Sequence, residues 1–376
     1  MRDAGRIAVF LLVVLGTWTL MHVYVVWRAW SVPAFSAHVP RWALVAAAVF
    51  LWLAYPLSRI LDRNGFDAVA RPLEFVGAAW LGVLFLACVG VFAVDVVTLG
   101  GMGLRSLAPS LRGWGLVAAA GLSVVALLQG LRPPVVVNYE VALPGLPPER
   151  DGLVLVEISD LHLGTLIGGS WTERLVERVE ARKPDLLVVD GDLIDGNVAR
   201  VQPLLPTLKR LRAPLGVFAV TGNHEVYAGI ERSVRLFEEA GYTVLRDRWA
   251  EVVPGLVLAG VDDLTARRQF AEADHPVEKA LAGRPAGATV FLSHTPWQAA
   301  KAAELGAGLM LSGHTHDGQI WPFGYLVQFT YPLMGGRYTV GSMTAIVCRG
   351  TGTWGPRMRL WRPSEIVRIT LRSPKS

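Results

Sequence analysis

The chain has 376 residues, which leaves room for two or three domains of ordinary size. Hydrophobic residues make up 52% of it and its mean hydropathy is +0.40, values that exclude a protein that is soluble along its whole length. The formal net charge of +5 comes from residues 1–132, which hold ten Arg, no Lys and five acidic residues. In the remainder 26 basic and 26 acidic residues cancel, so nucleic acid is not an expected partner, although a local basic groove stays open.

Four apolar runs follow one another in the N-terminal third of the chain. They cover residues 7–27, 42–58, 75–99 and 113–131. Runs of this length can cross a hydrocarbon core of about 30 Å, and Trp residues stand near their ends. A signal peptide is the alternative for the first run, but the run is too long and no cleavage site follows it. Buried soluble helices are the alternative for all four. We expect residues 1–132 to form a four-span anchor that embeds the protein in the lipid bilayer of the cell membrane.

The flanking arginines favour one orientation in the membrane. Four spans place both ends of the region on the same side. That side receives six arginines (Arg2, Arg6, Arg59, Arg63, Arg71 and Arg132), and the opposite side receives four (Arg28, Arg41, Arg105 and Arg112). The positive-inside rule therefore predicts a cytoplasmic second half. Asp95, near the end of the third run, is expected to reach the membrane interface, and we expect no activity of these spans beyond anchoring.

Residues 133–376 alternate between strand-like and helix-like segments. A Pro-rich connector over 133–150 contains one β-like stretch, VVVNYEVAL, which predicts a first edge strand. Further strands are expected over 153–158, 185–189, 215–220, 256–261, 289–292 and 308–312, and helices over 171–182, 229–240 and 296–304. This alternation is typical of an α/β sheet covered by helices. The two cysteines, Cys88 and Cys348, make a disulfide scaffold implausible.

Residues of the metal-binding types follow five of these strands. They occur in SDLHLG (Asp160, His162), DGDLID (Asp192), TGNHE (Asn223, His224), SHTP (His294) and GHTH (His314, His316). Each motif alone is weak, since a single loop histidine is usually only solvated. The carboxyl ends of strands in an open α/β sheet meet at one edge, however, so the ordered set predicts one shared site. The other histidines, His22, His38 and His275, are interpreted as incidental.

The spacing of GHTH has its own physical reason. In an extended or turning segment, side chains two residues apart point broadly the same way. His314 and His316 can therefore reach neighbouring ions, and Gly313 before them allows the backbone to approach closely.

The ordered series D-x-H, GD, GNH[DE], H and GHxH resembles the calcineurin-like metallophosphoesterase superfamily, over about residues 135–371. ISDLHLG, LSGHTHDGQ and CRGTGTWGPRMRLWRPSEI resemble the branch of bacterial membrane-associated phosphoesterases related to YkuE and YaeI, and the four spans are similar to those of transmembrane metallophosphoesterases. The resemblance implies a membrane α-helical region followed, over residues 133–376, by a four-layer α/β/β/α sandwich. Two positions depart from the family pattern: Asp190, where Thr is usual, and Asp317, where glycine is more frequent.

The resemblance also implies a site for two divalent cations, which neutralise a phosphoester and lower the pKa of a shared water. Asp192 is expected to bridge them. One cation takes Asp160, His162 and His316, and the other takes Asn223, His294 and His314. A nitrogen and oxygen donor set fits Mn, Fe, Zn, Co or Ni alike. His224 is expected to be a catalytic residue rather than a ligand, which hydrogen-bonds a phosphoryl oxygen or protonates the leaving alkoxide, oriented by Asp160 or Asp190. The alternative for His224 is a purely structural residue at a helix start.

Relatives in this branch include UDP-diacylglucosamine hydrolases, so a phosphodiester or pyrophosphate bond of a lipid-linked substrate is the expected target. A general phosphomonoesterase or phosphodiesterase of soluble substrates, a nuclease, and a metal-binding membrane sensor without turnover are the alternatives. The aromatic-rich segment IWPFGYLVQFTYPLMGG, residues 320–336, is interpreted as ordinary strand and core packing rather than as an apolar rim for a lipid tail.

Overall fold

The computed structural model describes residues 2–269 and 275–374, without the side chains of residues 2–11 and 63. It divides into two compact units. The first consists of Met1–Leu131 together with Gly355–Leu360, and the second of Arg132–Trp354 together with Trp361–Ser376. A short segment near the end of the chain thus belongs to the N-terminal unit, which the sequence did not indicate.

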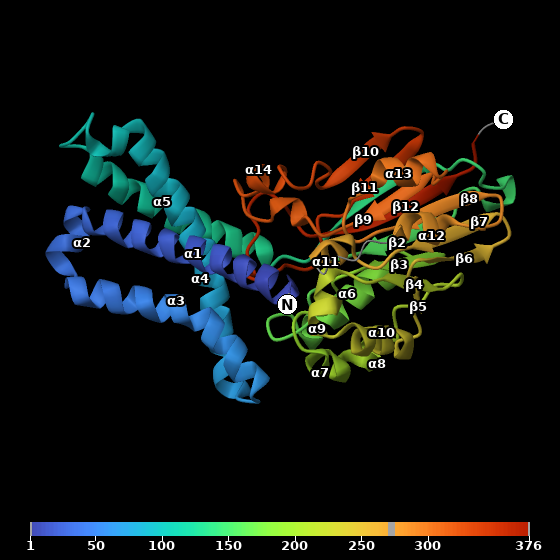
Figure 1. Ribbon diagram of the computed structural model, residues 1–376, viewed down its shortest axis with the longest axis horizontal. Helices are drawn as coiled ribbons and strands as arrows, with labels where there is room; N and C mark the ends of the chain where they lie inside the picture. Colours follow the sequence, from blue (N-terminus) through green and yellow to red (C-terminus); the bar gives the residue numbers. More distant parts are fainter. Residues whose placement is uncertain (1, 270–274, 375–376) are drawn as a thin grey trace. The chain divides into compact units, whose positions relative to one another are not determined.

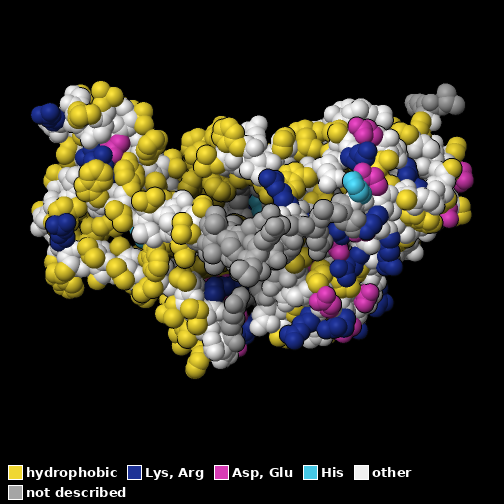
Figure 2. Space-filling model, in the orientation of Figure 1, with side chains coloured by type: hydrophobic (Ala, Val, Ile, Leu, Met, Phe, Trp, Pro, Cys, Tyr) yellow, Lys and Arg dark blue, Asp and Glu magenta, His cyan; other side chains and the backbone are white. Residues whose placement is uncertain are grey.

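The first unit is built from long apolar helices (Figure 1). They are α1 (Arg2–Trp30), α3 (Arg41–Arg63), α4 (Asp67–Val97) and α5 (Ala108–Gly130), with a short α2 (Pro33–His38) and a 3-10 turn η1 (Leu99–Gly101). All four long helices are long and apolar enough to cross a membrane, which confirms four candidate spans. Figure 2 shows hydrophobic side chains over much of their visible surface, as expected for helices that face lipid rather than water.

Asp95 lies near the end of α4 and has partners that the sequence did not indicate. Its carboxylate is buried and lies 2.6 Å from Arg28 Nε and 2.8 Å from Arg112 Nη2, and it accepts a hydrogen bond of 2.7 Å from Tyr24. A lone carboxylate among apolar helices would be costly, and two arginines from neighbouring helices remove that cost. We refer to these side chains as the Arg28–Asp95–Arg112 cluster.

The second unit contains two six-stranded sheets. The first sheet has the order β1 (Val135–Ala142), β12 (Glu365–Arg372), β2 (Val154–Ile158), β3 (Leu186–Asp190), β4 (Val217–Val220), β5 (Thr243–Val244). The second has the order β10 (Gly336–Val340), β11 (Met343–Val347), β9 (Leu309–Ser312), β8 (Ala288–Leu292), β7 (Leu256–Gly260), β6 (Arg248–Val253). The strands predicted from the sequence are therefore shared between two sheets, not gathered in one.

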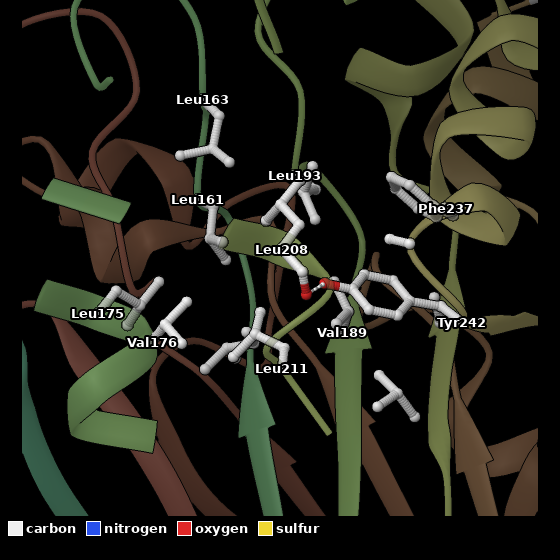
Figure 3. Close-up of a cluster of buried hydrophobic side chains, with 14 of the residues drawn as sticks. Leu161, Leu163, Leu175, Val176, Val189, Leu193, Leu208, Leu211, Phe237 and Tyr242 are labelled. Carbon is white, nitrogen blue, oxygen red and sulfur yellow. Dashed lines mark hydrogen bonds between the residues drawn. The ribbon is translucent and has the colours of Figure 1, made fainter. Parts of the chain in front are cut away.

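Three apolar cores hold these layers together. One fills the space between the sheets and includes Leu155, Val188, Leu258 and Leu311. A second packs the outer face of the first sheet against α6 (Gly169–Glu180), α8 (Leu205–Leu208) and α10 (Ile230–Glu239), and Figure 3 shows part of it, with the Tyr242 hydroxyl donating to the carbonyl of Leu208. The third packs the second sheet against α11 (Leu264–Gln269), α12 (Pro276–Leu281) and α13 (Ala299–Glu304). The order helix, sheet, sheet, helix confirms the expected four-layer sandwich.

The strand directions decide where the loops gather. β2, β3 and β4 are adjacent and parallel in the first sheet, and β8 and β9 are adjacent and parallel in the second. The carboxyl ends of these five strands, from two facing sheets, therefore lead into loops that gather at one edge of the sandwich.

Candidate dinuclear metal centre

The loops after these five strands carry the histidines and carboxylates singled out in the sequence. Asp160 and His162 follow β2, Asp192 follows β3, Asn223 and His224 begin α9 (Asn223–Ala228) after β4, His294 follows β8, and His314 and His316 follow β9. Three groups of side chains each have ligand atoms within 4.8 Å of one another: Asp160 with His162 and His316, His162 with Asp192 and His224, and Asp192 with His294 and His314. The groups share members, so these residues form one continuous cluster.

The shortest separations lie between potential ligand atoms. Nε2 of His162 lies 3.1 Å from Nε2 of His316, which in turn lies 3.3 Å from Asp160 Oδ1. Across the site, Nε2 of His294 lies 3.1 Å from Asp192 Oδ2. Imidazole nitrogens and carboxylate oxygens face a common centre on each side.

The donors fit divalent cations. One buried atom, Asn223 Oδ1, has no hydrogen-bond partner within the described part of the chain, which is costly unless something else binds it. Burial lowers the pKa of both His162 and His314 to about 3, so they hold the neutral form that ligates metals. Burial opposes a charge on His294 too, but Asp192 raises its pKa well above the ordinary value, so a cation bound there displaces a proton.

The backbone of the site is held in an uncommon conformation. Five of the expected ligands are non-glycine residues with φ between 48° and 67°: Asp160, His162, Asp192, His314 and His316. Such conformations persist only where the surrounding structure over-determines them, and they cluster at functional sites.

Gly313 allows two loops to approach each other. A Cβ on this residue would overlap the Ser159 hydroxyl and the Asp160 carboxylate, so the close approach that we expected of it is confirmed. Asp160 in turn accepts the backbone N–H of His314 at 3.1 Å.

We therefore predict that Gly313→Ala lowers the rate of phosphoester hydrolysis at least about 100-fold, because it separates Asp160 from the GHTH loop. Overpacking should also lower the free energy of unfolding by about 1–3 kcal/mol. Gly169→Ala is the matched control, since a Cβ there makes only an ordinary contact with Leu204. Equal hydrolysis rates for the two variants, measured on an aryl phosphodiester, would contradict the packing argument.

His224 lies beside this cluster and has a different partner from the one expected. Its Nδ1 lies 3.2 Å from Asp195 Oδ1, so Asp195 is the carboxylate that orients it, and the expectation of Asp160 or Asp190 is wrong. Burial lowers the pKa of an imidazole, but the charges of Asp192 and Asp195 outweigh this and raise the pKa of His224 to about 9. The backbone N–H of His224 donates to Asp192 at 2.9 Å, which links it to the site.

Known proteins are similar to this chain in sequence. The family described as calcineurin-like phosphoesterase matches residues 153–318. An uncharacterized metallophosphoesterase of Aquifex aeolicus is 34% identical over 234 residues, which cover 60% of this chain and 87% of that protein. The chain belongs to the calcineurin-like phosphoesterase family.

Two further relatives of this chain indicate which branch of the family it resembles. A transmembrane protein with metallophosphoesterase domain from Danio rerio is 36% identical over 269 residues, 68% of this chain and 62% of that protein. The uncharacterized metallophosphoesterase YkuE of Bacillus subtilis is 31% identical over 242 residues, 61% of this chain and 82% of that protein. The expected resemblance to YkuE and to transmembrane metallophosphoesterases is confirmed, although the phosphoesterase spans only about three fifths of the Danio rerio protein.

Two residues near the candidate site were not predicted from the sequence. The Glu225 carboxylate is buried and accepts three backbone N–H groups, from Asp192 at 2.8 Å, Ile194 at 3.0 Å and Gly222 at 2.7 Å. The Tyr331 hydroxyl lies 2.8 Å from Nε2 of His314. The glutamate in GNHE could have been identified as the third residue of a helix start, where capping carboxylates occur. Nothing local in the sequence marks Tyr331.

The two departures from the family pattern have different environments. Asp190 is fully buried, and neither of its carboxylate oxygens has a hydrogen-bond partner among the described residues, so burial raises its pKa well above the ordinary value. Asp317 lies 3.3 Å from Arg349 Nε and 3.1 Å from Arg362 Nη1. Its carboxylate therefore supports the loop after His316 through ion pairs.

The segment over residues 320–336 is not core packing, and that interpretation is wrong for most of it. It forms a cis peptide at Trp321–Pro322 and the short helix α14 (Gly324–Val327), and β10 begins only at its last residue, Gly336. Several of its apolar side chains are exposed: Trp321, Phe323, Tyr325, Leu326 and Phe329. We refer to residues 320–331 as the aromatic loop.

Proposed function

We propose that this phosphoesterase is anchored in a membrane by its first unit and hydrolyses a phosphodiester or pyrophosphate bond of a lipid-linked substrate with the help of two divalent cations. The observation that carries the proposal is the convergence of the histidines and carboxylates of five loops on one cluster. A purely structural cluster would be expected to give each buried polar atom a hydrogen-bond partner, whereas Asn223 Oδ1 has none among the described residues.

The residues divide into two sets around the proposed cations. Asp160, His162 and His316 would hold one, Asn223, His294 and His314 the other, and Asp192 would contact both. When bound, the cations neutralise phosphoryl charge and supply a nucleophile at neutral pH. Mn, Fe, Zn, Co and Ni all suit a nitrogen and oxygen donor set.

His224 is suited to proton transfer to the leaving group. Asp195 occupies Nδ1 of the imidazole, so Nε2 is the nitrogen left for a substrate. The ring also lies 6.1 Å from that of Trp354, whose backbone N–H and carbonyl are both held by the Gln319 side chain. A general acid that is held in this way meets the substrate with little loss of freedom.

The exposed aromatic loop is an argument for a lipid-linked substrate. It begins four residues after His316 and ends at Tyr331, which contacts His314, so both of its ends are fixed to the candidate site. Phe329, between these ends, is 89% exposed. Exposed apolar side chains next to a charged site suit a substrate with a polar head and an acyl tail.

The proposal also includes the orientation of the protein in the membrane and its binding partners. Six arginines against four favour a cytoplasmic catalytic unit, with the lipid bilayer as the partner of the first unit. The balanced charge of residues 133–376 gives no support to nucleic acid as the substrate.

The substrate assignment is tested with the full chain in detergent. Turnover of a UDP-diacylglucosamine is compared with that of a soluble aryl phosphodiester and an aryl phosphomonoester, each with Mn²⁺. We expect the highest kcat/KM for the acylated compound. Preference for either soluble compound would reject the lipid assignment, and metal binding without any hydrolysis would favour a sensor.

The role of His224 predicts a dependence on the leaving group. His224→Gln should slow hydrolysis of an alkyl phosphodiester by about 10²–10⁴-fold, because an alkoxide needs a proton to leave. A p-nitrophenyl ester, whose leaving group needs none, should slow less than about tenfold. Asp195→Asn should show the same pattern more weakly. Equal losses on both esters would indicate a structural role for His224.

A further inference from the structure

An apolar groove runs between the helices of the first unit. Its volume is about 250 Å³, and its walls come from all five helices, α1 to α5. Six of its sixteen lining residues are alanines: Ala29, Ala47, Ala48, Ala87, Ala119 and Ala120. Small side chains on facing helices leave this space open. Larger side chains at these positions would close it.

The single titratable residue of the lining is His22, and it presents no free polar atom to the groove. Its Nε2 accepts the indole N–H of Trp80 at 2.8 Å, and its Nδ1 lies 2.8 Å from the carbonyl of Trp18. With both ring nitrogens engaged, the lining offers hydrocarbon contacts only. A polar ligand would leave its own hydrogen-bonding groups unsatisfied there.

The lining and the surroundings of the groove favour an acyl chain as its occupant. The walls present hydrocarbon almost throughout, and in a membrane the surrounding medium is hydrocarbon chain. A single acyl chain of the bilayer suits both the lining and the medium.

Two arginine side chains lie near one end of the groove. Arg28 lies between the lining residues Val26 and Ala29 on α1, and Arg112 lies one turn before the lining residue Leu116 on α5. Both arginines share the single carboxylate of Asp95, so the cluster keeps one net positive charge. The Arg28 guanidinium also stacks over the Trp27 ring at 3.8 Å, which holds it at this level of the helix.

More positive charge gathers at the same end of the helices. α1 and α4 end there, whereas α3 and α5 begin there, because short connections join consecutive antiparallel helices. Residues 28–48 and 95–120 contain Arg28, Arg41, Arg105 and Arg112, and Asp95 is their one acidic residue. An anionic headgroup is therefore favoured over a zwitterionic one.

We propose that the first unit binds one anionic phospholipid of the bilayer, with an acyl chain in the apolar groove and the phosphate beside Arg28 and Arg112. This site is separate from the phosphoesterase centre and does not depend on the proposed substrate. It gives the membrane unit a function beyond anchoring.

Photolabelling of the full chain in nanodiscs tests the proposal. Phosphatidylglycerol and phosphatidylcholine, each with a diazirine on the acyl chain, are irradiated with the protein, and the labelled peptides are mapped by mass spectrometry. We expect label on residues 44–51 and 116–120, at least about fivefold stronger with phosphatidylglycerol. Equal labelling by the two lipids would overturn the proposal.

Variants that fill the groove provide the matched control. Ala48→Trp places a large ring in the groove and should reduce phosphatidylglycerol labelling of these peptides at least about fivefold, whereas Ala46→Trp, on the opposite face of α3, should not. Ala120→Trp repeats the test from α5 if the first variant fails to fold, as judged by helicity. Arg28→Gln should remove the preference for phosphatidylglycerol. Unchanged labelling in folded Ala48→Trp or Ala120→Trp protein would overturn the site.

Discussion

Asp192→Asn is expected to lower kcat for phosphoester hydrolysis by at least about 10³-fold while the protein stays folded. The substitution keeps the shape of the side chain but removes the charge that faces both sets of ligands, and several kcal/mol of transition-state stabilisation depend on bound cations. Metal content, measured on purified protein by mass spectrometry, should fall from two ions per chain. A thermal melt monitors folding.

Asp190→Asn is the matched control, because Asp190 lies two residues away on the same strand end. Its carboxylate is buried without a hydrogen-bond partner in the described residues, so replacing it removes no ligand and should leave the metal content at two. Loss of metal in both variants would mean that any change of charge here disrupts the loop. Full activity in Asp192→Asn would refute the metal centre itself.

Glu225→Ala is expected to cost the most stability of any single change near the site. It leaves three buried N–H groups without an acceptor, and breaking a buried charged network costs about 3–5 kcal/mol. Because two of those groups belong to Asp192 and Gly222, hydrolysis should fall by about 100-fold as well. Urea unfolding and kcat on an aryl phosphodiester measure the two effects.

Glu238→Ala serves as the comparison, since Glu238 is an exposed residue of α10. It should change the free energy of unfolding by less than about 0.5 kcal/mol. If Glu225→Ala were equally mild, the carboxylate would not be holding the two loops, and another group would have to satisfy their N–H groups.

Much of the fold was predictable from local patterns. Fully buried parallel strands such as β3 appear as continuous apolar runs, and each ends where a polar motif begins, so both the strand and the adjoining ligand could be identified. The division into two sheets was not predictable from the same runs, because strand order depends on pairings between distant segments. β12, for example, comes last in the chain yet lies between β1 and β2.

The candidate site shows the same difference between local patterns, which could be predicted, and contacts between distant segments, which could not. The expected ligands sit in short motifs that carry their own chemistry, whereas the supporting contacts join distant segments. Asp195 meets His224 across 29 residues, and Tyr331 reaches His314 from beyond an irregular loop. The ion pairs of Asp95 could not be predicted for the same reason: Arg28 and Arg112 lie on other helices, and hydropathy along one helix says nothing about the side chains of neighbouring helices.

Under the proposed function, the attachment of the aromatic loop at both ends would keep the choice of substrate apart from the chemistry of the metal centre. Its two anchor points remain with the histidines whatever stands between them, so insertions or exchanges within residues 320–330 can leave the hydrolytic apparatus in place. A chain of this design could change its substrate through this one segment while the proposed metal ligands stay in place.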